Sequence, residues 1–165
     1  MMNKNITIKL IFGAIFTLFY QIIIAPRTSF ANTNADMALI LTIWVALTCN
    51  PKTVVIFGFA VGLLVGALTP IELGWASLLL AIIGYLVCII KNKIVIDPLP
   101  SKIATLICSI FVYNFFYQLF TNFDLFIINF SYMITTILFA SINTAIAGII
   151  VFIIIRYRHI LRKLI

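Results

Sequence analysis

The stretch Gly58-Phe59-Ala60-Val61-Gly62-Leu63-Leu64-Val65-Gly66 places three glycines at a spacing of four residues inside an apolar run. Residues four apart share one face of an α-helix, so these glycines present a strip without side chains to a neighbouring helix. A phosphate-binding loop would continue with Lys and Ser or Thr, whereas Ala67 and Leu68 follow here. We therefore expect a closely packed membrane helix, and we call Gly58, Gly62 and Gly66 the glycine repeat.

The composition extends this expectation to the whole chain. Of the 165 residues, 64% are hydrophobic and only 9% are charged, whereas soluble domains carry about 25% charged residues. We predict an all-α integral membrane protein. The net charge of +7 could suggest nucleic-acid binding, but the cations lie between and beyond the apolar runs and form no patch, so we expect no nucleic-acid partner. Cys49, Cys88 and Cys108 lack the spacing of a metal site and are expected to be buried.

The apolar runs predict a single membrane domain, residues 1–165, with six transmembrane helices. The predicted spans are residues 6–25, 37–49, 53–68, 73–90, 103–120 and 133–155. The second and third are short for a bilayer core of about 30 Å, which leaves a re-entrant hairpin around Asn50-Pro51-Lys52 as an alternative. We expect Asp36 to cap the second helix, because a carboxylate there accepts from free N–H groups. The uncharged run 125–155 is too long for one span, so a turn is predicted at residues 124–131.

The placement of the cations predicts the orientation. With six spans and a cytoplasmic N-terminus, every one of the 11 Lys and Arg residues except Arg27 faces the cytoplasm. Such an asymmetry follows the positive-inside rule. A re-entrant hairpin would move only Lys52 to the outside. We predict a multi-pass protein with both termini in the cytoplasm.

Three side-chain patterns indicate helix contacts. Thr136, Ala140, Thr144 and Gly148 form a second row of small residues, the small-residue stripe, which we expect to pack against the glycine repeat. Asn114 and Gln118 share a helix face and should bond to a neighbouring helix. Aromatic residues crowd the region from Phe111 to Tyr132, as a belt at the membrane surface or as a docking surface for a partner helix. In the docking interpretation the contacts are Phe115, Phe116, Phe120 and Phe123.

The chain lacks the residue patterns of catalysis. Its one histidine, His159, lies in the basic tail, and no acidic residue stands in the middle of a predicted span. A membrane enzyme needs a nucleophile with a base, a metal-ligand cluster or paired carboxylates. We therefore predict that the protein is not an enzyme and carries no cofactor or metal.

Several positions together resemble the MreD family of rod-shape-determining proteins. They are Asp36 before the second span, Gly58-Phe59 and Gly62-Leu63-Leu64 in the third, Leu73-Gly74 before the fourth, and Asn143-Thr144 in the last. The resemblance implies a six-helix bundle similar to the substrate-binding subunits of energy-coupling-factor transporters. Two positions depart from the family: Ala35 stands where Pro is frequent, and Gly66 where Asp is common. Because Gly66 replaces that Asp, this chain lacks the second acidic group, and it cannot perform any role that the group has in the family.

The resemblance implies a non-catalytic scaffold of the bacterial elongation machinery in the inner membrane. Its implied partners are an MreC-like periplasmic scaffold protein, the RodA–penicillin-binding-protein synthase and MreB. The aromatic region would then hold a partner's single transmembrane helix, and the basic tail would contact anionic lipid or filament. The alternative is the substrate-binding subunit of an energy-coupling-factor vitamin transporter, with Asn114, Gln118, Asn143 and the loop 27–34 around a pocket. A small ion channel or a lipid-interacting protein is a third possibility.

Overall fold

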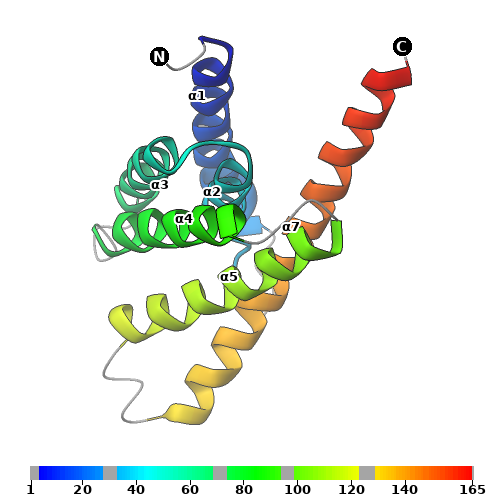
Figure 1. Ribbon diagram of the computed structural model, residues 1–165. Coiled ribbons are helices and arrows are strands. Elements are labelled where there is room, and N and C mark those ends of the chain that lie inside the picture. The colour runs from blue at the N-terminus through cyan, green and yellow to red at the C-terminus, as the bar shows by residue number, and fades with distance from the viewer. Residues whose placement is uncertain (1–3, 28–32, 69–73, 94–98, 123–128, 165) are drawn as a thin grey trace.

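The computed structural model describes residues 4–27, 33–68, 74–93, 99–122 and 129–164, and these are nearly all helical, as predicted (Figure 1). The elements are α1 (Lys4–Phe19), the π-helical turn η1 (Tyr20–Ile24), the 3₁₀ turn η2 (Ala25–Arg27), α2 (Met37–Thr48), α3 (Pro51–Gly66), α4 (Trp75–Lys93), α5 (Leu99–Thr121) and α7 (Phe130–Leu164).

Three of these helices are long and apolar enough to cross a membrane. They comprise α4, residues 100–121 of α5 and residues 130–154 of α7, with mean hydropathies of 1.8, 1.6 and 2.5. Residues 10–24, α2 and α3 are apolar but shorter, and the 12 residues of α2 extend only about 18 Å at 1.5 Å per residue. Length and composition therefore fit a membrane protein, while six crossings and their orientation stay predictions.

The outer surface of the described helices is apolar. Large hydrophobic side chains are exposed on α1, α3, α4, α5 and α7, with exposed fractions of 72% for Phe12, 71% for Ile56 and 60% for Ile154. A soluble monomer rarely exposes so much contiguous apolar area. Such a surface fits contact with lipid tails.

Local sequence explains where the central helices begin. Asp36 is the N-cap of α2, and its Oδ1 accepts a hydrogen bond from the N–H of Leu39 at 3.0 Å, which confirms the predicted cap. Pro51 occupies the first turn of α3, where its missing N–H costs nothing. Gly74, just before α4, has a φ of 104°, a conformation that favours glycine.

The last helix is longer than predicted. The turn expected at residues 124–131 lies partly outside the described residues, but Phe130 already belongs to α7. From there α7 continues for 35 residues without a break, which is about 52 Å. Its C-terminal turns extend beyond the other helices (Figure 1). The predicted basic tail therefore continues the helix.

The core is centred on α2, which packs against α1, α3, α4, α5 and α7. Leu39, Ile40 and Ile43 of this helix are completely buried. A short helix surrounded by five others needs apolar side chains on every face, and the sequence of α2 supplies them. The helix therefore anchors the rest of the bundle.

The glycine repeat packs on α4. A Cβ on Gly58 would lie 2.9 Å from the carbonyl oxygen of Leu80, and one on Gly62 would overlap the backbone of Ser77. Gly66 is buried as well. Gly148 of the small-residue stripe instead contacts Leu106 of α5 and Ile40 of α2. The prediction that the two rows pack on each other is therefore wrong, because the neighbouring helix α4 occupies the glycine face.

The cysteines do not share one environment. Cys88 is buried, Cys49 is partly buried and Cys108 is exposed. The expectation of burial is wrong for Cys108, because it lies beside Ile107 on the outward face of α5.

Candidate functional site

Two cavities adjoin α5. The first, which we call the polar cavity, has a volume of about 310 Å³ and is walled by η1, residues 33–36, α3, α4, α5 and α7. Its lining residues are Gln21, Thr33, Asn34, Ala35, Asp36, Val65, Ala76, Tyr113, Asn114, Tyr117, Gln118, Thr136 and Ala140. Segments distant in sequence thus meet around one space, which is the usual setting of a binding site.

One wall is the segment of residues 33–36, which we call the strap. It is tied to α7 by two hydrogen bonds: Asn143 Nδ2 donates to the carbonyl of Thr33 at 3.0 Å, and the N–H of Asp36 donates to Thr144 Oγ1 at 3.2 Å. Asp36 and Asn143-Thr144 are among the positions that carry the family resemblance. Residues more than 100 positions apart therefore hold the strap in place. Asn143 and Thr144 do not themselves line the cavity, so the expectation that Asn143 lines a pocket is wrong, because its amide is used to bind the strap.

A second wall is one face of α5. Tyr113 and Tyr117 stack with ring centroids 5.6 Å apart. Asn114 Nδ2 donates to Ser141 Oγ of α7 at 3.2 Å, which confirms its predicted bond to a neighbouring helix. Gln118 Oε1 instead accepts from Asn122 Nδ2 at 2.8 Å, four residues further on. The wall therefore combines aromatic faces with amide groups.

Small side chains and a helix irregularity make room for the polar cavity. Ala76 of α4 and Ala140 of α7 line it, so at Ala140 the small-residue stripe borders a space. Gln21 enters from η1, where the helix widens into a π turn, a feature often found at functional sites. The sequence analysis did not identify Gln21 as a cavity residue, although a single amide side chain within an apolar span could have indicated it. It also missed Tyr113 and Tyr117, which repeat the spacing of Asn114 and Gln118.

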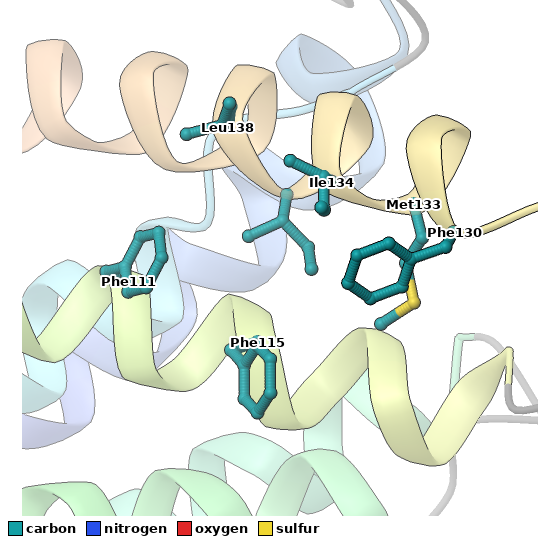
Figure 2. A pocket seen from close by; sticks show the side chains of 7 residues that line it. Phe111, Phe115, Phe130, Met133, Ile134 and Leu138 are labelled. Atoms are coloured by element: carbon teal, nitrogen blue, oxygen red, sulfur yellow. The ribbon is translucent and has the colours of Figure 1, made fainter. Parts of the chain in front are cut away.

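The second cavity is apolar and lies between α5 and α7. It measures about 270 Å³, and Figure 2 shows the side chains of the two helices around it. We call it the apolar groove; its lining residues are Phe111, Phe115, Phe130, Met133, Ile134, Ile137 and Leu138. Met133 and Ile137 are buried at its base, while Phe111 and Phe115 are partly exposed.

The four residues predicted to contact a partner helix lie in different surroundings. Phe115 lines the apolar groove. Phe116 is exposed and meets Phe115 edge to face at 5.5 Å. Phe120 stacks on Trp75 of α4 with ring centroids 4.7 Å apart, so it joins two helices of the chain itself. Phe123 lies outside the described residues. Phe111, which was not among the predicted contacts, shares the groove with Phe115.

The two cavities differ in the chemical groups that line them. Among the described residues, no group of three or more His, Cys, Asp or Glu side chains could hold a metal ion. Asp36 is the only carboxylate in the lining of either cavity as described. The polar cavity offers hydrogen bonds and one acidic side chain, whereas the apolar groove offers only hydrocarbon contact.

Comparison of the chain with protein-family models, with curated proteins and with solved structures found no match.

Proposed function

We propose that the chain is a non-catalytic scaffold of the bacterial cell-elongation machinery in the inner membrane. It would work beside an MreC-like single-span scaffold protein, the RodA–penicillin-binding-protein synthase and MreB. The observation that carries this proposal is the apolar groove between α5 and α7. Two further contacts support the proposal: Asn143 bonds the carbonyl of Thr33 and Thr144 bonds the N–H of Asp36, so the positions Asp36, Asn143 and Thr144, which carry the resemblance, all take part in holding the strap on α7.

The apolar groove suits a partner's transmembrane helix. In lipid, helices do not associate through the hydrophobic effect, because lipid tails are as apolar as the side chains; they associate through close packing. A groove with Phe111 and Phe115 on one side and Ile134 and Leu138 on the other gives side chains a recess to fill. Aromatic anchors around such a recess are typical of residues that dominate binding energy.

The groove can be tested by co-purification from the protein's own bacterial membranes. We expect the double variant Phe111→Ala with Phe115→Ala to recover several-fold less of a single-span periplasmic scaffold protein than the unchanged chain. Phe139→Ala is the matched control, because Phe139 is exposed on α7 and does not line the groove. Equal recovery by the double variant and the control would contradict the proposal.

The polar cavity favours a second candidate, the substrate-binding subunit of an energy-coupling-factor vitamin transporter. Asn114 and Gln118 line this cavity, and the strap, which begins at the end of the predicted covering loop, forms one wall. Native mass spectrometry of the gently extracted protein separates the two candidates. An associated ATPase-linked membrane subunit, or a bound small molecule of vitamin mass, would favour the transporter; a single-span scaffold protein would favour the elongation machinery.

A further inference from the structure

We propose that the polar cavity binds a small neutral molecule that carries a carboxamide or lactam group. The inference rests on the cavity and goes beyond the scaffold role; for the transporter candidate it would name the class of substrate. It starts from Gln21, the one amide side chain in residues 6–25. Amides in membrane helices commonly bond to a neighbouring helix, but within the part of the chain that the structure describes the side chain of Gln21 makes no hydrogen bond.

The position of Gln21 gives its amide access to the polar cavity. Gln21 is partly buried in η1, the π-helical turn, and lines this cavity. Among the described residues, every fully buried side-chain nitrogen or oxygen has a hydrogen-bond partner. The amide of Gln21 has none, so its atoms are accessible. A polar group in an apolar span is costly without a partner, and residues of this kind inside membranes commonly mark binding sites.

Gln118 adds a second accessible amide from another helix. Its Oε1 accepts from Asn122 Nδ2 at 2.8 Å, whereas its Nε2 donates to no other group in the described ranges. Gln118 is also only partly buried, so its Nε2 is accessible for the same reason. Two amides, one from η1 and one from α5, therefore line the cavity with donors and an acceptor that the fold does not use.

These amides select the chemistry of the ligand. A carboxamide carries two N–H donors and an oxygen with two lone pairs, so it pairs best with a group that has a donor and an acceptor side by side. Carboxamides and lactams have this arrangement and are neutral. Asp36, Tyr113 and Tyr117 also line the cavity, but each already takes part in contacts within the fold. Recognition is therefore assigned to Gln21 and Gln118.

The size and the apolar lining of the polar cavity limit the rest of the ligand. About 310 Å³ lies at the lower end of the range of roughly 300–1,000 Å³ for small-molecule sites. Val65, Ala76 and Ala140 supply apolar surface that a ring can contact. A single ring with a carboxamide fits, whereas a nucleotide or a peptide does not.

The first experiment measures binding of benzamide to the full chain in nanodiscs, with empty nanodiscs to account for partition into lipid. Three compounds with the same ring serve as controls: acetophenone keeps the acceptor but has no N–H, benzoate is an anion, and benzylammonium is a cation. We expect saturable binding of benzamide at least tenfold tighter than that of any control. No saturable binding of benzamide, or equal or tighter binding of a control, would overturn the proposal.

Gln21→Met tests the assigned amide. The change keeps the length of the side chain but removes its hydrogen-bonding groups, and it breaks no side-chain hydrogen bond that the structure describes. We expect benzamide to bind at least tenfold more weakly, while the affinity for acetophenone changes little. Ile22→Met is the matched control, because Ile22 is exposed on the same turn and does not line the cavity. Unchanged benzamide affinity in the Gln21→Met variant would overturn the assignment.

Ala140→Leu tests the location of the site. The larger side chain should fill the polar cavity and abolish benzamide binding, and Ala104→Leu on the exposed face of α5 is its control. Full binding by a folded Ala140→Leu variant would place the ligand outside this cavity and contradict the proposal. The co-purification experiment on the apolar groove does not involve these residues, so the scaffold role and the amide site can fail separately.

Discussion

The helix pairs α3–α4 and α5–α7 are both neighbours in the bundle, but they are joined in opposite ways. Between α3 and α4, Gly58 and Gly62 bring one backbone onto another. Between α5 and α7, Phe111, Phe115 and Ile134 leave a groove. In lipid, the first kind of contact depends on the absence of side chains and tolerates no addition. The second leaves a recess into which another molecule can pack. The first pair therefore closes a contact within the fold, whereas the second leaves one open.

Gly62→Ala should have the largest effect, because the new Cβ overlaps the backbone of Ser77, which cannot rotate away. We expect a loss of about 3 kcal/mol in the free energy of unfolding, measured by denaturant titration in detergent. Gly13→Ala is the matched control, since its Cβ would meet only a side-chain atom of Leu41 at 3.9 Å. Similar stability in the two variants would show that α3 and α4 are not in backbone contact.

Thr144→Val tests the strap. The change keeps the shape of a buried side chain but removes the oxygen that accepts from the N–H of Asp36. An unpaired buried N–H costs about 1–3 kcal/mol. We expect a loss of about 2 kcal/mol together with faster amide hydrogen exchange at Asp36. Thr135→Val is the control, because Thr135 is exposed and bonds only to its own helix in the contacts described. Unchanged exchange at Asp36 would contradict the hydrogen bond.

Comparing Phe120→Ala with Phe116→Ala tests whether the Phe120 ring stabilises the fold through its contact with α4. Phe120 stacks on Trp75, whereas Phe116 contacts only aromatic residues of α5 among the ring pairs described. Aromatic pairs contribute about 0.5–1.5 kcal/mol beyond their burial. We expect Phe120→Ala to lower stability about 1 kcal/mol more than Phe116→Ala, with altered Trp75 fluorescence. If the two variants had the same stability and the same fluorescence, the Phe120 ring would not be stacked on Trp75.

Gly148→Ala should have the smallest effect. Its Cβ would approach only side-chain atoms of Leu106, at 3.0 and 3.1 Å, and of Ile40, at 3.5 Å. These atoms can shift, and alanine gains about 1 kcal/mol of helix propensity over glycine. We expect a change within about 1 kcal/mol in the same titration. A loss as large as that of Gly62→Ala would mean that α7 also depends on backbone contact.

The sequence predicted the features that depend on local pattern. The helical class follows from composition and from the apolar runs, and the cap at Asp36 follows from a carboxylate before such a run. The inter-helix bond of Asn114 was predictable because an amide in an apolar span needs a partner.

Features that depend on which faces meet were not predictable. The glycine repeat and the small-residue stripe look complementary in sequence, yet α4 covers the first, and α2 and α5 meet the second at Gly148. Phe120 belongs to an aromatic cluster in sequence, but the tertiary fold places it on Trp75. The polar cavity itself combines groups from six segments, and no single stretch of sequence contains its pattern.

The two bonds of the strap also bear on biosynthesis. Thr33 and Asn143 are 110 residues apart, and Asp36 and Thr144 are 108 apart. Because a chain is made from its N-terminus, α2, α3 and α4 can assemble while the strap still lacks its partners on α7. A nascent chain made only as far as residue 142 can already form the contact of the glycine repeat with α4, but it lacks the residues of α7 that hold the strap. Synthesis of the last helix is therefore the step at which the wall of the polar cavity is completed.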